Sequence, residues 1–296
     1  MRLVYTENVH ALELPPGHKF PIGKYDRIHA ALAAEHADLM MLGARAAVED
    51  LLLVHDASYV RAVRGGQLEA SAVRRLGFPW SESLAERALR SVGGTLAAVA
   101  WAAEHGAAGH IAGGTHHAFR DRGEGFCVFN DLAVGVLVAR RDHDLARAAV
   151  IDLDVHQGNG TASIFEDDPN VFTLSLHAQK NYPFHKERSS RDVALPDGCE
   201  DDRYLAALAP ALEEAASHRP DVVFYQAGVD ALAGDRLGRM SLTHEGLARR
   251  DAMVFALAKR LHVPIVVTLG GGYGRDLERT IAAHVGVYRR LVASAA

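Results

Sequence analysis

The chain has 296 residues, of which 49% are hydrophobic and 23% are charged, and its formal net charge is −5. This composition is typical of a globular protein and excludes a disordered or fibrous chain. The negative net charge argues against a nucleic-acid-binding protein, because phosphate neutralisation needs clustered Lys and Arg. No apolar run reaches the roughly 18 residues that a bilayer span requires, so we expect no membrane partner.

The chain contains only two cysteines, Cys127 and Cys199. One disulfide is possible by count, but so few cysteines in a chain of this length are typical of a reducing compartment. Residues 1–7 lack the apolar stretch of a secretory signal. We therefore expect a cytoplasmic protein.

Apolar, β-branched runs alternate along the chain with segments of helical periodicity. In chain order, the sequence predicts a helix over 83–104, strands over 148–153 and 171–176, a helix over 202–217, a strand over 222–225, a helix over 243–261 and a strand over 264–269. Continuous β-branched runs between helices are typical of parallel strands that are buried on both faces. No linker-like segment divides the chain. We predict an α/β fold: a single domain over residues 1–296, with a largely parallel central sheet flanked by helices on both faces.

Two acidic residues and one histidine near strand ends are candidate metal ligands. Asp154 and His156 follow the first predicted strand and lie two residues apart, so their side chains point to the same face. A carboxylate and an imidazole suit zinc or ferrous iron, and Asp230, after a later strand, is a candidate third ligand. The same pattern also fits a polar strand end at which Asp152 and Asp154 cap the next turn.

Two further segments carry groups suited to hydrolysis. Adjacent histidines, His116 and His117, follow a diglycine, and an imidazole is a suitable base near neutral pH. A glycine-rich loop carries Tyr273, whose phenol can donate a hydrogen bond to a carbonyl oxygen as negative charge develops there. Structural histidines and an aromatic lid are the alternative interpretations. The glycine spacing fails the dinucleotide-binding pattern at Arg275.

Five separated motifs together resemble those of the zinc-dependent histone deacetylase family, which has an arginase-like fold, and they occur in the family's order. They are GGTHHA at 113–118, GFCVFND at 125–131, IDLDVHQGNGT at 151–161, AGVDALAGDRLG at 227–238 and GGGY at 270–273. Asn159 stands where many class I members have aspartate. This asparagine, the compact length and the segment 180–184 resemble the class IV branch and its bacterial relatives.

The resemblance implies one catalytic zinc ion with a hydroxyl donor beside it. The zinc ligands would be Asp154, His156 and Asp230, and Tyr273 would polarise the acyl carbonyl. The family also binds potassium near the zinc. The matching potassium positions are Asp152, Asp154, His156, Ser175 and Leu176.

The tandem histidines match the family's proton-transfer pair. By resemblance, Asp152 would orient His116 and Asn159 would orient His117, which would be the main proton shuttle. Because an amide holds no negative charge, we expect His117 to be less basic than it would be beside a carboxylate.

The substrate tunnel is also assigned by resemblance. Phe126, after Gly125, would form one wall of an acyl-lysine tunnel, and the segment from Tyr182 to Phe184 would form the opposite wall. Core packing would explain the same aromatic residues. The rim aspartate with which many members hold the substrate backbone has no clear counterpart around residues 77–81.

The leading hypothesis is a zinc-dependent amidohydrolase that removes acetyl or longer fatty acyl groups from lysine side chains or a related amine. Its partner would be an acylated lysine peptide or a small acylated amine, such as an acetylpolyamine. The class IV resemblance favours long acyl groups. Two alternatives stay open: an acyl-lysine or metal-binding module without turnover, and a two-metal manganese hydrolase of the arginase type.

Overall fold

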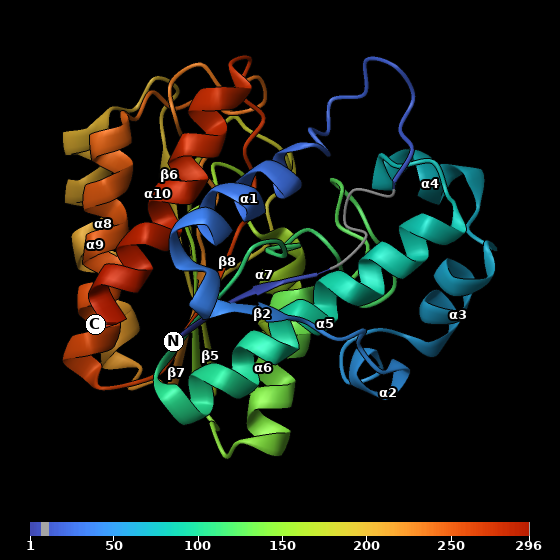
Figure 1. Cartoon of the computed structure of the whole chain (residues 1–296), viewed down its shortest axis with the longest axis horizontal. Coiled ribbons are helices and arrows are strands. Elements are labelled where there is room, and N and C mark those ends of the chain that lie inside the picture. The colour runs from blue at the N-terminus through green and yellow to red at the C-terminus, as the bar shows by residue number, and fades with distance from the viewer. Residues whose placement is uncertain (7–11, 296) are drawn as a thin grey trace.

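Eight parallel strands form one sheet in the order β2-β1-β3-β8-β7-β4-β5-β6 (Figure 1). The computed structural model describes residues 1–6 and 12–295. The strands are β1 (Arg2–Tyr5), β2 (Met40–Leu42), β3 (Ala107–His110), β4 (Ala148–Asp152), β5 (Val171–Ala178), β6 (Arg191–Leu195), β7 (Val222–Gln226) and β8 (Ile265–Thr268). Every pair of neighbouring strands is parallel, as predicted.

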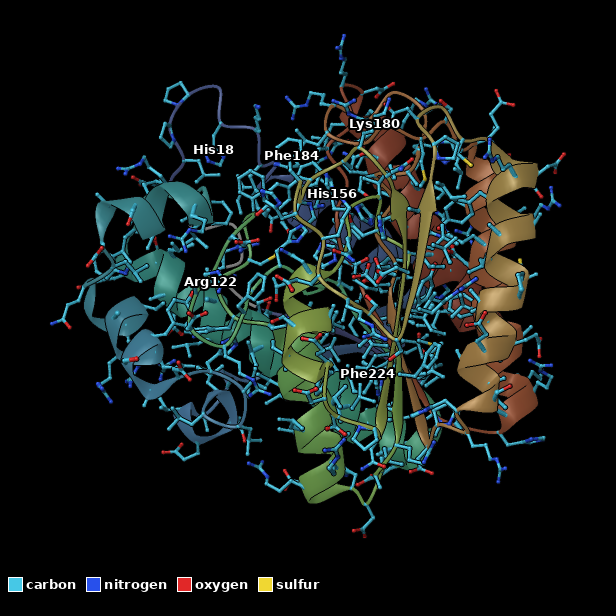
Figure 2. The ribbon with its side chains drawn as sticks, turned by 180° about the vertical axis from the view of Figure 1, so that it is seen from behind. His18, Arg122, His156, Lys180, Phe184 and Phe224 are labelled. Carbon is cyan, nitrogen blue, oxygen red and sulfur yellow. The ribbon has the colours of Figure 1, made fainter. Side chains whose placement is uncertain are left out.

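Helices cover both faces of the sheet, which is seen edge-on between them in Figure 2. One layer contains α1 (Lys24–His36), α8 (Asp201–Ser217), α9 (His244–Leu261) and α10 (Leu277–Ala295). The opposite layer contains α5 (Glu82–His105), α6 (Asp131–Asp142) and α7 (Asn159–Phe165). The short elements are η1 (Ala37–Leu39), α2 (Val48–Leu51), α3 (Ala57–Gly65) and α4 (Ala70–Leu76). Within residues 1–6 and 12–295, no helix combines the length and apolarity needed to cross a membrane.

The predicted α/β class is confirmed, and the predicted elements lie where expected, to within two residues at each end. The helix predicted to begin at residue 243 begins one residue later, because the Thr243 side chain caps it by accepting a hydrogen bond from the Gly246 amide. Strands β1, β2, β3 and β6 were not predicted. They have five residues or fewer, and β3 reads Ala-Ala-Gly-His, so none of them offers a long β-branched run.

The strand order brings four remote segments of the chain to one edge of the sheet. Strands β3, β8, β7 and β4 are consecutive in the sheet, and all run in the same direction. Their carboxyl ends therefore lie side by side, which is where ligands bind in open α/β sheets. The histidine pair, the glycine loop, Asp230 and the Asp-x-His segment follow these four strands.

Helix α5 packs closely on the segment that follows β2, and Gly93 permits this approach. A Cβ at Gly93 would lie 1.9 Å from the carbonyl oxygen of Ala44 and 2.6 Å from the amide nitrogen of Ala46. Because both obstacles are backbone atoms, we expect Gly93→Ala to lower Tm by about 3 °C or more. A thermal unfolding scan measures this change.

The matched control is Gly286→Ala in α10. Its new Cβ would meet only the flexible end of the Arg290 side chain, at 3.0 Å. Alanine favours a helix over glycine by about 1 kcal/mol, so this variant should keep or raise Tm. Equal loss of stability in both variants would contradict the packing interpretation.

Candidate metal centre and active site

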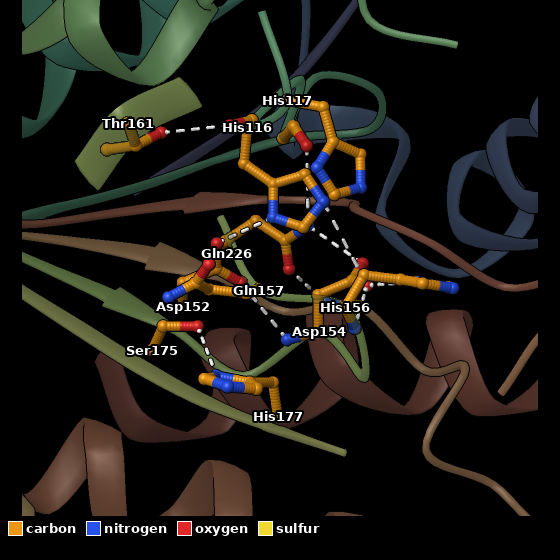
Figure 3. A network of polar contacts seen from close by, with 12 residues as sticks. His116, His117, Asp152, Asp154, His156, Gln157, Thr161, Ser175, His177 and Gln226 are labelled. Atoms are coloured by element: carbon orange, nitrogen blue, oxygen red, sulfur yellow. Dashed lines mark hydrogen bonds and ion pairs between the residues drawn. The ribbon is translucent and has the colours of Figure 1, made fainter. Parts of the chain in front are cut away.

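Asp154, His156 and Asp230 converge at the carboxyl ends of β4 and β7. The Nδ1 atom of His156 lies 2.9 Å from Oδ1 of Asp154 and 3.1 Å from Oδ2 of Asp230. Each residue offers one potential ligand atom, and these three atoms lie within 4.8 Å of one another. All three side chains are buried. Figure 3 shows Asp154 and His156 beside the histidine pair.

The second oxygen of each aspartate is held by the protein. Oδ2 of Asp154 accepts hydrogen bonds from Nε2 of Gln226 at 2.9 Å and from the Gly271 amide at 2.8 Å. Oδ1 of Asp230 accepts one from the Val155 amide at 2.8 Å. The remaining oxygens, Oδ1 of Asp154 and Oδ2 of Asp230, are thus directed towards the shared position.

This donor set fits one zinc ion. Ligand atoms about 2.0–2.1 Å from a tetrahedral zinc lie about 3.3 Å from one another, close to the separations around the His156 ring nitrogen. Burial raises the pKa of Asp230 to about 7, and the charge of Asp154 adds to this rise. A divalent cation between the two carboxylates would offset their repulsion and stabilise both in the ionised form.

The tandem histidines lie in contact with each other, and each has its own hydrogen-bond partner. Nδ1 of His116 lies 2.6 Å from Oδ2 of Asp152, and Nδ1 of His117 lies 2.7 Å from Oδ1 of Asn159 (Figure 3 shows the first pair). The ring centroids are 4.0 Å apart. The structure therefore brings together both pairs that the sequence predicted.

The two rings differ in basicity. Burial lowers the pKa of His116, but the charges of Asp152 and Asp154 outweigh it and raise the pKa to about 9. Burial, followed by the nearby charges of His116 and His156, lowers the pKa of His117 well below its usual value. His117 is therefore neutral at pH 7 and can accept a proton.

Glu124 is a buried residue of the site that sequence reasoning missed. Its Oε1 accepts hydrogen bonds from Nδ2 of Asn159 at 2.7 Å and from the Tyr182 hydroxyl at 2.8 Å. An ionised carboxylate only accepts, so it draws the amide NH2 of Asn159 to its side and turns Oδ1 of Asn159 towards His117. The Nδ1 atom of His117 then carries the hydrogen, and Nε2 is left as the base.

Lys24, at the start of α1, is a second residue that the sequence did not reveal. Its Nζ is buried 3.3 Å from the carbonyl oxygens of both Gly270 and Gly272, and it lies 5.5 Å from the centroid of the Tyr273 ring. Burial lowers the pKa of Lys24 to about 8. The lysine fixes the glycine loop that presents Tyr273.

A cavity of about 610 Å³ opens above the metal centre. The predicted tunnel residues that line it are Gly125, Phe126, Tyr182 and Phe184. The Tyr182 ring packs edge-on against His117, with the centroids 5.0 Å apart, and the Phe126 ring lies 6.1 Å from that of Tyr273. Phe184 is 82% exposed, so it stands at the mouth of the cavity and not in a buried wall.

The backbone of Phe126 is constrained. Its φ is 68°, in the left-handed region that a bulky side chain rarely adopts. The ring packs beside those of Phe20 and Phe78, with centroids 5.5 and 5.2 Å away. This aromatic cluster holds the Phe126 ring at the cavity wall.

Two of the predicted potassium positions are neighbours in the sheet. Asp152 and Ser175 are register partners in β4 and β5, and Leu176 is the next residue of β5. Oδ1 of Asp152 accepts a hydrogen bond from the Asp154 amide at 3.1 Å. The potassium site itself stays a prediction.

A family model, curated relatives and solved structures each match this chain over nearly its whole length. The family model described as histone deacetylase domain matches residues 18–288. An uncharacterized protein of Picosynechococcus sp. is 42% identical over 93% of this chain and 93% of its own length. Histone deacetylase 2 of Arabidopsis thaliana is 34% identical over 90% of this chain and 72% of its own. The crystal structure of an HDAC homolog from Aquifex aeolicus matches with a TM-score of 0.85 at 25% identity, over 99% of this chain and 84% of that one.

The arrangement of Glu124 and Asn159 predicts how substitutions there combine. Glu124→Met removes the acceptor that orients Asn159, so we expect kcat to fall about tenfold with little change in KM. Glu124→Gln keeps an acceptor oxygen and should retain most of the activity. Asn159→Asp places two buried carboxylates together and should lower kcat as well.

The decisive measurement is a double-mutant cycle of kcat. Glu124→Gln should lower kcat only slightly beside Asn159, yet it should raise the activity of Asn159→Asp, because a glutamine NH2 can donate to the new carboxylate. Zinc content and Tm are measured in parallel to exclude unfolding. Additive effects of the two substitutions would contradict this role of Glu124.

Proposed function

The chain belongs to the histone deacetylase family, and from this premise we propose that it removes acyl groups from lysine side chains or a chemically related amine. The family consists of zinc-dependent hydrolases that cleave amide bonds, so this chain is a hydrolase of that kind. The observation that carries the proposal is the convergence of Asp154, His156 and Asp230 on one point of a cavity that also contains His117 and Tyr273.

We assign the zinc ligands as Asp154, His156 and Asp230. The bound metal supplies Lewis-acid chemistry, which polarises the amide carbonyl and acidifies water. Nε2 of His117 accepts the proton of the attacking water and passes it to the amine nitrogen as the C–N bond breaks. The products are then a carboxylate and a free amine.

Tyr273 acts as the hydrogen-bond donor to the acyl oxygen. Burial, followed by the charges of Asp154 and Asp230, raises the pKa of its phenol well above the usual value, so the hydroxyl keeps its proton. Such a donor stabilises the negative charge that develops on the oxygen when water attacks. His116, held by Asp152, lies against His117 and positions it.

Further features of the proposal rest on the resemblance. The catalytic domain spans residues 1–296, belongs to the class IV branch and prefers long acyl groups. Potassium binds at Asp152, Asp154, His156, Ser175 and Leu176. A cytoplasmic location is supported by the two buried thiols of Cys127 and Cys199, which form no disulfide.

The proposed activity is tested by measuring free acid released from acetyl-, octanoyl- and myristoyl-lysine peptides and from an acetylpolyamine, with and without a chelator. We expect hydrolysis that a chelator abolishes and zinc restores, with one zinc per chain. Zinc content without hydrolysis of any acylated amine would favour the binding module. Two metals per chain would favour the arginase-type alternative.

Two substitutions should separate metal binding from chemistry. Tyr273→Phe removes one hydrogen-bond donor to the developing charge, so we expect kcat to fall about 100-fold or more while zinc stays bound. Asp230→Ala removes a ligand and should lose both zinc and activity. The control Tyr5→Phe lies in β1, where Tyr5 stacks on His29, and should change neither. Full activity of Tyr273→Phe would refute the proposed role of the phenol.

A further inference from the structure

Long cationic side chains surround the mouth of the cavity. The exposed residues of this cationic rim are Lys19, Arg75, Lys180, Arg236 and Arg239. They come from the segment before α1, the end of α4, the loop after β5 and the loop after β7. Figure 2 shows Lys180 beyond His156, at the end of the sheet away from Phe224.

Among the residues that the structure describes, no exposed acidic side chain lies on the wall of the cavity beside this rim. The only carboxylate among the described lining residues is that of Asp154, which is buried in the metal centre. Arg239 is paired with Asp197 at 3.1 Å, whereas the other four rim cations form no ion pair with any residue that the structure describes. Because the chain as a whole has a net charge of −5, the positive rim is a local feature.

Arg236 is held in place at the rim. Its Nε donates to the carbonyl oxygen of Tyr273 at 2.9 Å, and its Nη2 donates to that of Lys19 at 3.1 Å. A guanidinium has five N–H donors, so several stay available to a ligand. The guanidinium is therefore held at the mouth of the cavity by the loop that carries Tyr273, with N–H donors left over.

The rim faces the part of the substrate that stays outside the cavity. In an Nε-acyl-lysine, four methylenes separate the amide nitrogen from the α-carbon, so groups on the α-carbon lie near the mouth when the amide reaches the metal centre. A cleft lined by charges of one sign attracts ligands of the opposite sign and repels ligands of its own sign. Cationic acetylpolyamines would meet repulsion here.

We infer that this site selects acylated amines that carry a carboxylate on the part of the substrate that stays at the mouth of the cavity. The inference rests on the proposed function, which it narrows to anionic substrates. Two sources supply this chemistry: acidic side chains flanking an acyl-lysine in a peptide, and the α-carboxylate of free Nε-acyl-lysine. Arg236 and Lys180 are specificity-determining residues in either case.

The first measurement compares kcat/KM for one acyl-lysine peptide flanked by Asp, by Ser or by Lys. We expect kcat/KM for the Asp-flanked peptide to be about ten times that for the Lys-flanked peptide at low salt. This Asp-to-Lys ratio should shrink as added salt screens the charges of the rim. Free Nε-acyl-lysine is compared with its α-carboxamide to distinguish the two sources. N1-acetylspermidine should be the poorest substrate.

The second measurement assigns the preference to the rim. Arg236→Gln and Lys180→Gln should each reduce the Asp-to-Lys ratio about two- to five-fold. The matched control is Lys259→Gln, which removes one exposed charge near the end of α9, just before β8 begins and thus at the opposite edge of the sheet. This variant should leave the ratio unchanged. Because a ratio is compared, a general loss of activity in the Arg236 variant does not obscure the result.

Charge selection is also measured without turnover, as the Kd of the three peptides for Tyr273→Phe protein. Tighter binding of the Asp-flanked peptide than of the Lys-flanked peptide supports the inference, whether or not the protein hydrolyses them. If such binding occurs but no acylated amine is hydrolysed, the proposed function alone fails. Hydrolysis with no charge preference, or with a preference for the Lys-flanked peptide, overturns the inference and leaves the proposed function standing. The inference is also overturned if Lys259→Gln reduces the Asp-to-Lys ratio as much as Arg236→Gln and Lys180→Gln do.

Discussion

The site depends on two buried carboxylates and one buried imidazole that meet at a single point. Burying such groups is costly unless their charges are compensated. Protein donors hold the far oxygens of Asp154 and Asp230, whereas on the facing side Oδ1 of Asp154 accepts from the His156 amide and both facing oxygens lie beside the His156 ring nitrogen. A cation at the shared position would supply the missing compensation. The same requirement explains the glycine loop: a Cβ at Gly271 would lie 2.2 Å from Oδ2 of Asp230, so only glycine leaves room there.

The sheet provides the geometry that this convergence needs. Four consecutive parallel strands end together, and each contributes a short segment of the site. Since helices cover both faces of the sheet, the polar residues at the carboxyl ends are the groups left to face a cavity. The rigid strands hold these groups in place, while the loops that follow form the mouth and its positive charge.

An uncharged amide, that of Asn159, orients the proposed base His117. Asn159 carries no charge, and its orientation is set by Glu124, which also holds the Tyr182 hydroxyl. One carboxylate thus links the proposed base, His117, to a wall of the cavity. Lys24 has a comparable role on the other side, where it fixes the carbonyl groups of the loop that presents Tyr273.

The sequence by itself determined the α/β class, the longer strands and helices, and the motifs that carry the candidate metal ligands, the histidine pair and Tyr273. These features are encoded locally, in periodicity and in residues that follow strand ends. Only the tertiary structure decided which distant residues meet: Glu124 reaches Asn159 across 35 positions, and Lys24 reaches Gly272 across 248. Such contacts depend on the order of the strands in the sheet. The number of residues between two positions in the sequence does not determine how far apart they lie in space. Strands β1, β2, β3 and β6 were missed because they offer no continuous β-branched run, whereas β7 and β8 are similarly short but do offer one.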